Sequence, residues 1–535
     1  MSGLTSIDDW NVASRFVRDL PADRDRDIRP REVRGAAYSV VIPTPVTAPT
    51  VRVVSPETAA LLGLDKAAYT GEQAQRFADV FGGNALVDGM TPVAACYGGH
   101  QFGHWAGQLG DGRALLLGEV ADVEGGRQEL QLKGAGPTPY SRRADGRAVL
   151  RSSIREFLCS EAMHHLGIPT TRALSLVTTG EGVVRDMFYD GHAEEEPGAI
   201  VCRVAPSFLR LGSFQLFAAR NELMELRALV DTAIAHHFPE LSALASADKP
   251  YALLEEVSRR TVALLCEWQR VGFVHGVMNT DNLSLLGLTI DYGPYGWMEG
   301  VDPQFTPNTT DLPGRRYAYG AQPRIACWNL ARFAEALLAL EPGQQDRFAR
   351  SLETTGLMME QALRNMWRSK LGLDFDGAPD DDDVDTLRSS LFAAFKAAEV
   401  DFTLFFRALS STMPTDLDMA ALQHAFYSEA TFANVDVQQR FASWLAEWSD
   451  ACAADPRGAR RLDDMQLVNP KYILRNAWVQ TAIEAAEKGN FDEVHTLLDV
   501  VRRPYDEQPH YAAYADKRPE WARTKAGCSM LSCSS

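Results

Sequence analysis

Five side chains, spread over three places in the chain, have the types needed to bind a phosphate together with a metal ion. Lys133 ends an alternating apolar run, Glu156 lies 23 residues further on, and a later segment contains Asp281, Asn282 and Asp291. A lysine oriented by a carboxylate binds phosphate oxygens, and carboxylate and carboxamide oxygens are ligands for Mg²⁺. Considered one at a time, neither residue indicates a function, because Lys133 is also explained as an exposed surface lysine and Glu156 as an ordinary glutamate on a helix.

The segment around Asp281 has the spacing of a protein-kinase catalytic loop but lacks the kinase base. Aligning His275 with the histidine of the pattern H-R-D-x-x-x-x-N places Asn282 on the metal-binding asparagine and Asp291, in Asp-Tyr-Gly, on the second metal ligand. Val277 then occupies the position of the proton-accepting aspartate, and a valine cannot accept a proton. Asp281 is the replacement nearby, and a purely structural turn residue is the alternative.

A second group of residues is suited to clamping a triphosphate. Gly110 and Gly112 precede Arg113, while Arg203 and Arg210 lie seven residues apart further along the chain. Guanidinium groups bind phosphate oxygens bidentately, and glycines allow the backbone to approach a phosphate closely. The glycine pair by itself is a weak signal.

Two histidines, His100 and His104, have a spacing that would suit a metal site on a helix. Glycines interrupt the segment Tyr97–Trp105, and it contains neither a carboxylate nor a cysteine. We therefore expect a structural loop or a turn beside a ligand rather than a metal site.

Short elements must position these residues. We expect a hairpin over Leu115–Leu132 with its turn at Gly125-Gly126, followed by a helix over Arg151–Leu166 that carries Glu156. Further strands are predicted at Leu174–Thr178, Val183–Phe188 and Ile200–Val204. Long amphipathic helices are predicted at Leu216–His237, Leu253–Val271, Trp328–Leu340, Phe348–Leu371 and Val437–Ala453.

These elements predict an α+β protein with at least two lobes. The order of Lys133, Glu156, Asn282 and Asp291 resembles that of a protein kinase active site, and this resemblance implies a two-lobed, protein-kinase-like (pseudokinase) fold. Residues 1–85 form an extension packed on the core, 86–215 an N-terminal lobe, and 216–535 a largely helical C-terminal lobe. The acidic run Asp380–Asp385 is expected to be a solvated loop before a helix that starts near Leu387.

Composition excludes several other classes of protein. Of the 535 residues, 46% are hydrophobic and 23% charged, and the net charge of −18 disfavours nucleic acid and anionic membranes as partners. No apolar run is long enough to span a bilayer, and eight cysteines are too few for a disulfide framework. The first residues lack a secretion signal, so we expect a cytoplasmic protein, with the mitochondrion as the alternative.

Six segments of the chain resemble the selenoprotein O family of protein adenylyltransferases, which have a pseudokinase fold. The segments are Tyr97–Gly103, Gln131–Tyr140, His275–Asn282, Asp291–Gly296, Asn469–Asn476 and Arg502–Gln508. The resemblance implies that ATP binds in a flipped orientation, with its α-phosphate facing the acceptor. AMP would pass to Ser, Thr or Tyr hydroxyls of other proteins, and pyrophosphate would leave.

The resemblance also implies roles for individual residues. Asp281 matches the proton acceptor, Asn282 and Asp291 match ligands of Mg²⁺ or Mn²⁺, and Glu156 supports Lys133. The positions that match nucleotide-binding residues are Gly110, Gly112, Arg113, Lys133, Asp145, Gly146, Arg203, Arg210 and Asp291.

The C-terminal Cys533-Ser534-Ser535 resembles the terminal motif of the family. In some relatives this cysteine pairs with one after the Asp-Tyr-Gly motif, but Gln304–Asn308 contains no cysteine here. Cys533 would instead pair with Cys528, act as a free redox-sensitive thiol, or have no regulatory use.

Two other functions stay open from the sequence alone. The first is transfer of the γ-phosphate to a protein or small molecule through Asp281. The second is an ATP-binding scaffold without catalysis, for which Val277 is the main argument.

Overall fold

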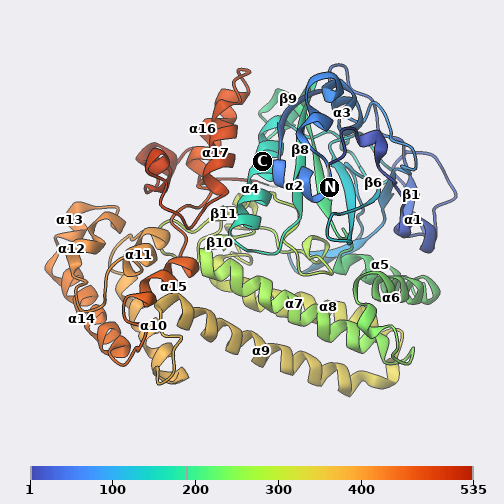
Figure 1. Ribbon diagram of the computed structural model, residues 1–535. Coiled ribbons are helices and arrows are strands. Elements are labelled where there is room, and N and C mark those ends of the chain that lie inside the picture. The colour runs from blue at the N-terminus through green and yellow to red at the C-terminus, as the bar shows by residue number, and fades with distance from the viewer. Residues whose placement is uncertain (1–2, 188–190, 533–535) are drawn as a thin grey trace.

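The computed structural model describes residues 3–187 and 191–532 and shows a β-rich part followed by a mainly helical part (Figure 1). Seven strands form an antiparallel sheet in the order β1-β3-β6-β7-β9-β8-β2. They are β1 (Tyr38–Val40), β2 (Thr50–Val54), β3 (Val93–Ala95), β6 (Ala114–Ala121), β7 (Arg127–Lys133), β8 (Arg172–Asp186) and β9 (Ala193–Ala205). The mixed α/β composition of the predicted fold is thereby confirmed.

Both edge strands of the sheet come from residues 1–85, the predicted extension. β1 pairs with β3 at one edge, and β2 pairs with β8 at the other. The same segment contains the helices α1 (Arg15–Asp19), α2 (Pro56–Leu61) and α3 (Ala74–Phe81). Phe77 of α3 shares one buried core with Leu115 and Leu130 of the central strands. The segment is therefore an integral part of the sheet layer.

The hairpin predicted at Leu115–Leu132 is confirmed as β6 and β7. Its turn contains Gly125-Gly126, and Lys133 is the last residue of β7. The helix predicted at Arg151–Leu166 is confirmed as α4 (Leu150–His165), which packs against β8 and β9. Sheet and helix together place Lys133 opposite the side chains of α4.

The apolar runs predicted after α4 form two long strands rather than three short ones. Leu174–Thr178 and the first part of the predicted strand Val183–Phe188, up to Asp186, belong to β8, which shifts register between Thr178 and Gly182 where it pairs with β9. Ile200–Val204 lies in β9. The last residue of the second run, Phe188, lies outside the described residues.

The second half of the chain consists mainly of helices. They are α5 (Leu211–Ala219), α6 (Leu223–His237), α7 (Lys249–Val271), α8 (Gln322–Leu338), α9 (Gln345–Leu371), α10 (Asp381–Phe395), α11 (Phe402–Leu409), α12 (Met419–Leu422), α13 (Glu429–Phe432), α14 (Val435–Cys452), α15 (Arg460–Val468), α16 (Asn476–Ala486) and α17 (Asp492–Val501). The predicted helices near α7, α8, α9 and α14 are confirmed. The single helix predicted at Leu216–His237 is wrong, because Asn221 adopts a left-handed conformation (φ 57°) between α5 and α6.

The acidic run is the start of a helix, so its prediction as a loop was wrong. Asp380 is the N-cap of α10, and its Oδ1 accepts a hydrogen bond from the Asp383 amide at 3.0 Å. Asp381 in the first turn pairs with Arg368 of α9 at 2.8 Å. Carboxylates at a helix N-terminus are stabilised by the helix dipole, and charge alone does not reveal this capping role.

The long helices α7 and α9 lie beside each other, below the sheet and α4 in the view of Figure 1. The fully buried Trp268 of α7 shares a core with Phe157 of α4, Val479 of α16 and Leu497 of α17. Within residues 3–187 and 191–532, no helix has the length and hydropathy needed to cross a bilayer.

Candidate active site

A cavity of about 560 Å³ opens between the sheet and the loop 275–282. It collects residues from the central strands, including β7, β8 and β9, and from loop segments that are far apart in the sequence. The predicted site residues that line it are Gly110, Gly112, Arg113, Lys133, Arg203, Arg210, Asp281, Asn282 and Asp291. The structure thus brings together most of the residues that the sequence singles out.

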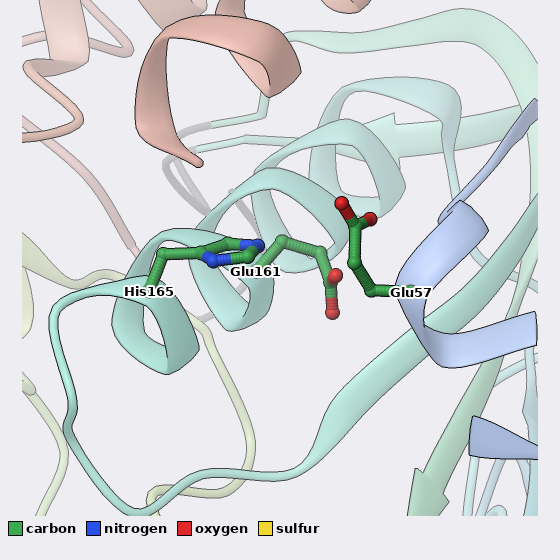
Figure 2. Close-up of side chains that lie close together, drawn as sticks. All are labelled: Glu57, Glu161 and His165. Carbon is green, nitrogen blue, oxygen red and sulfur yellow. The ribbon is translucent and has the colours of Figure 1, made fainter. Parts of the chain in front are cut away.

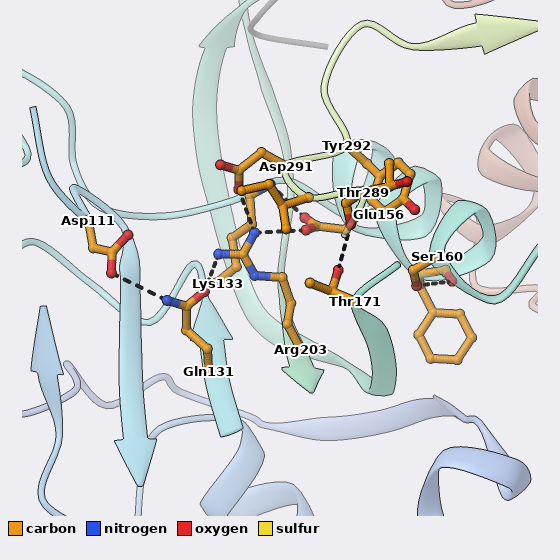
Figure 3. A network of polar contacts seen from close by, with 12 residues as sticks. Asp111, Gln131, Lys133, Glu156, Ser160, Thr171, Arg203, Thr289, Asp291 and Tyr292 are labelled. Carbon is orange, nitrogen blue, oxygen red and sulfur yellow. Dashed lines mark hydrogen bonds and ion pairs between the residues drawn. The ribbon is translucent and has the colours of Figure 1, made fainter. Parts of the chain in front are cut away.

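Lys133, which lines this cavity, forms a buried ion pair with Glu156 of α4 (Figure 3). Lys133 Nζ lies 2.6 Å from Glu156 Oε2, and Arg203 lies 3.0 Å from Glu156 Oε1. Burial raises the pKa of Glu156, but the two cations outweigh it and hold that pKa below its usual value. The glutamate therefore stays charged and orients both cations.

Asp291 is clasped by two arginines. Its Oδ1 lies 2.7 Å from Arg203, and its Oδ2 pairs with Arg210. These cations, with Lys133, overcome the effect of burial and hold the pKa of Asp291 well below its usual value. Arg203 also donates to Gln131, so it joins three elements of the site (Figure 3).

Arg113 is a cation of the cavity that is available to an anion. In the part of the chain that the structure describes, its guanidinium has no hydrogen-bond or ion-pair partner. Burial lowers its pKa, although an arginine stays protonated in a protein. Arg113 is half-buried, and a partly desolvated charge without a partner is costly, so a phosphate oxygen beside it would be favoured.

The predicted glycines are needed for close packing. A β-carbon at Gly110 (φ 100°) would lie 2.5 Å from Tyr140 Cγ, and one at Gly112 would lie 3.0 Å from the Tyr140 carbonyl oxygen. A β-carbon at Gly146 would overlap the backbone of Gly136. These contacts close the rim of the cavity around the segment 138–147.

Asp145 does not line the cavity in this structure. It forms a two-pronged ion pair with Arg185 of β8, with both distances 2.7 Å. Ala144 and Arg185 do line the cavity, so this pair lies at its rim. The arrangement ties the segment 138–147 to the β8–β9 hairpin.

Asp281 has the electrostatic environment of a proton acceptor. Burial raises its pKa to about 6, although the hydrogen bond from Gln101 lowers it. Gln101 Nε2 donates to Asp281 Oδ2 at 3.1 Å, and Arg210 donates to the Asp281 carbonyl oxygen at 2.7 Å. A carboxylate with a pKa near neutrality suits general base catalysis, whereas the buried Val277 offers no acceptor.

Asn282 and Asp291 fit a hard divalent cation. Asn282 Nδ2 donates to the Val277 carbonyl oxygen at 3.1 Å, which leaves Asn282 Oδ1 free as a ligand. Asp291 supplies carboxylate oxygens in the same cavity. Oxygen donors of this kind bind Mg²⁺ or Mn²⁺, and a bound cation would compete with the arginines for Asp291.

Sequence reasoning missed three residues of the site. Asp111 is fully buried and accepts from Tyr97 Oη at 3.2 Å and from Gln131 at 3.3 Å, while the Tyr97 ring lies 4.7 Å from the Arg210 guanidinium. The third is Gln101. Tyr97 and Gln101 both belong to a segment that resembles the selenoprotein O family, and this resemblance was the sequence feature that could have identified them as site residues.

The segment with two histidines is a hairpin of β4 (Gly98–Gln101) and β5 (His104–Gln108). Its two-residue turn excludes the helical spacing required for a metal site, in agreement with the expected turn. The His100 amide donates to Thr280 Oγ1 at 2.7 Å, so the hairpin contacts the loop 275–282.

A second group of potential metal ligands lies outside the cavity (Figure 2). Glu57 of α2 lies near Glu161 and His165 of α4. Arg172 binds both oxygens of Glu161, at 2.7 and 2.6 Å, and Arg502 pairs with Glu57. Because the carboxylates are already neutralised by guanidinium groups, we interpret this cluster as an ion-pair network between helices.

The C-terminal segment packs beside the loop that follows the Asp-Tyr-Gly motif. The Thr309 amide donates to the Leu531 carbonyl oxygen at 2.8 Å, and the Leu531 amide donates to the Pro307 carbonyl oxygen at 3.0 Å. Cys528 is a buried thiol, and burial raises its pKa to about 11. Cys533 lies outside the described residues, so its predicted pairing with Cys528 stays a prediction.

A cavity in which cations face a buried carboxylate and further carboxylate and carboxamide oxygens is typical of enzymes that transfer groups from nucleotides. Residues 30–502 match the family described as protein adenylyltransferase SelO. The chain belongs to this family.

Proteins named protein nucleotidyltransferase YdiU are similar over nearly their whole length. The relative from Azoarcus sp. (strain BH72) is 57% identical over 98% of this chain and 99% of its own. Those from Methylobacillus flagellatus and Xanthomonas axonopodis pv. citri are 52% and 54% identical, with the same coverage. The family resemblance noted in the sequence is thereby confirmed.

Proposed function

We propose that this chain transfers AMP from ATP to Ser, Thr or Tyr hydroxyls of proteins. The observation that carries the proposal is the position of Asp281. Its buried carboxylate shares one cavity with the cations of Lys133, Arg113, Arg203 and Arg210 and with the oxygens of Asn282 and Asp291. Family membership favours AMP as the transferred group.

Each cation has a role in this proposal. Lys133, held by Glu156, binds the phosphates of ATP together with Arg113, Arg203 and Arg210. Gly110, Gly112, Asp145 and Gly146 shape the part of the site that takes the nucleotide. Asn282 and Asp291 would hold Mg²⁺ or Mn²⁺, which neutralises phosphate charge when it is bound.

The acceptor hydroxyl oxygen attacks the α-phosphorus, and the bond from this phosphorus to the bridging oxygen of the β-phosphate breaks. Pyrophosphate leaves with the bonding electron pair, and the hydroxyl proton passes to Asp281. The cations stabilise the negative charge that develops on the leaving group.

The proposal includes a protein-kinase-like architecture with two lobes, at residues 86–215 and 216–535, and the segment 1–85 added to the first. The antiparallel sheet, the ion pair from β7 to α4 and the order of the loop residues support it. The compartment stays a prediction, with the cytoplasm first and the mitochondrion as the alternative.

The test uses ATP labelled at the α- or the γ-phosphate, Mg²⁺, the purified chain and a mixed protein extract as acceptor. We expect the α label on protein and a mass gain of one AMP group, and Asp281→Ala should lower the rate of transfer roughly 100-fold to 10,000-fold while ATP still binds. Transfer of the γ label would instead indicate a kinase. ATP binding without either product, under reducing and oxidising conditions alike, would indicate a scaffold.

A further inference from the structure

The β4–β5 hairpin forms one wall around Asp281. Its first strand lies along the loop 275–282, and the His100 amide donates to Thr280 Oγ1 at 2.7 Å. Thr280 in turn donates to Gln215 Oε1 of α5 at 2.7 Å. The residue that precedes Asp281 is therefore fixed from both sides by groups that are buried or half-buried.

Gly99 of this strand leaves just enough room for the carboxylate. A β-carbon at position 99 would lie 2.9 Å from both Cβ and Cγ of Asp281. Real β-carbons essentially never approach other atoms so closely, so any other residue would push Asp281 away. Gly99 does not have a positive φ, so the need for glycine here is steric rather than conformational.

The two oxygens of the Asp281 carboxylate have different surroundings. Oδ1 is buried and has no hydrogen-bond partner among the described residues. Oδ2 accepts from Gln101 Nε2 at 3.1 Å, and both Gln101 and Asp281 line the cavity. A carboxylate oxygen has two lone pairs, so Oδ2 retains one for a second donor.

The end of the hairpin is anchored in a way that fixes Gln101. The next residue, Phe102, has a positive φ of 51°, which is strained for a phenylalanine. Its amide donates to Tyr317 Oη at 2.9 Å and to Asn279 Oδ1 at 3.2 Å. Tyr317 also donates to Asn279 at 2.7 Å, so the turn is bound to the same loop that carries Asp281.

We propose that Gln101 is a positioning residue that directs Asp281 Oδ2 toward the acceptor hydroxyl, with Gly99 providing the space for this orientation. The inference rests on the proposed function, in which Asp281 accepts the hydroxyl proton. Gln101 contacts the base, whereas the proposed function assigns the phosphates of ATP to Lys133 and the arginines. We therefore expect a Gln101 variant to change the rate of transfer more than the affinity for ATP.

The first test is Gln101→Leu, which keeps a similar volume and removes the donor. We expect kcat to fall on the order of tenfold to 100-fold, less than the roughly 100-fold to 10,000-fold expected on removing the base itself. The KM for ATP should be unchanged. Gln128→Leu is a matched control, because Gln128 Nε2 also donates to an aspartate, Asp122, at 2.8 Å but lies outside the cavity.

A double-mutant cycle separates positioning from general stability. Gln101→Leu and Gly99→Ala should each lower kcat in the wild-type chain, and neither should lower the residual rate further in an Asp281→Ala background. Equal fractional losses in both backgrounds would overturn the proposal, as would wild-type kcat in Gln101→Leu.

The position of the label on ATP also distinguishes a failure of this inference from a failure of the proposed function. The α- and γ-labelled products are followed in the same reactions. Transfer of the γ label alone would refute the proposed AMP transfer, but the cycle would still decide the role of Gln101 on that product. Gly99→Ala gives a second independent variant if Gln101→Leu proves unstable.

Discussion

Replacing Asp291 by asparagine should destabilise the chain even without nucleotide or metal. The substitution keeps the shape of the side chain but removes the charge that Arg203 and Arg210 share. The side chains of both arginines are only 3% exposed. After the change, Arg203 keeps the Glu156 carboxylate at 3.0 Å, whereas the carboxylate left to Arg210 among the described residues is Asp111 at 3.8 Å, beside its hydrogen bond to the Asp281 carbonyl oxygen.

The expected loss follows from this geometry. Removing one partner of a buried ion pair costs about 3–5 kcal/mol of unfolding free energy. The Asp291 side chain is 20% exposed and Arg203 retains a second carboxylate, so we expect the lower end, about 3 kcal/mol. Asp145→Asn is the matched control, because its pair with Arg185 is also two-pronged but its side chain is 45% exposed. That variant should lose less than about 1 kcal/mol.

Urea unfolding, followed by circular dichroism and tryptophan fluorescence, measures both variants in the absence of ligand. Asp291→Asn should unfold at clearly lower urea than Asp145→Asn and the wild type. A second series with Mg²⁺ and ATP at about 100 times the Kd should add about 2.7 kcal/mol to the wild type. We expect Asp291→Asn to gain almost none of this. Equal stability of the two variants without ligand would refute the assigned role of the arginine clasp.

Three further predictions concern other parts of the chain. Burial raises the pKa of Glu129 to about 8, so this side chain is protonated in the folded state at pH values where it is ionised in the unfolded state. The free energy of unfolding should therefore fall as pH rises from about 4.5 to 8. Glu129→Gln should flatten this pH dependence in unfolding measured across that range. Gly146→Ala should weaken ATP binding in calorimetry, because its β-carbon would overlap Gly136, and an unchanged affinity would contradict this packing argument. Asp380→Ala should cost about 1 kcal/mol in urea unfolding through loss of the α10 N-cap, whereas the same change at the exposed Asp382 should cost less.

The arginine clasp suggests why the cavity contains so many cations. Arg203 and Arg210 are neutralised by acidic side chains in the described structure, while Arg113 is not. A nucleotide and a metal would redistribute these pairs, with phosphate oxygens taking over the guanidinium groups and the metal taking over Asp291. The site is therefore held together in the absence of ligand by the same charges that the proposed reaction uses.

Local patterns in the sequence were sufficient to predict the strands and the helix next to the site. The alternation before Lys133, the Gly125-Gly126 turn and the helical spacing around Glu156 depend on neighbouring residues, and each was confirmed in the structure. Patterns failed where one residue overrides the periodicity. Asn221 divides a predicted helix, and Asp380 caps a helix where a run of charges indicated a loop.

The sequence by itself determined the residue types of the site, the order of its elements and the family. Only the tertiary structure decided which charges meet, because contacts between distant segments depend on packing and not on local periodicity. Gln101 meets Asp281 across 180 residues, and Arg203 meets Asp291 across 88. The free energy of these contacts comes from burying charged and polar groups together, and no short sequence pattern records it.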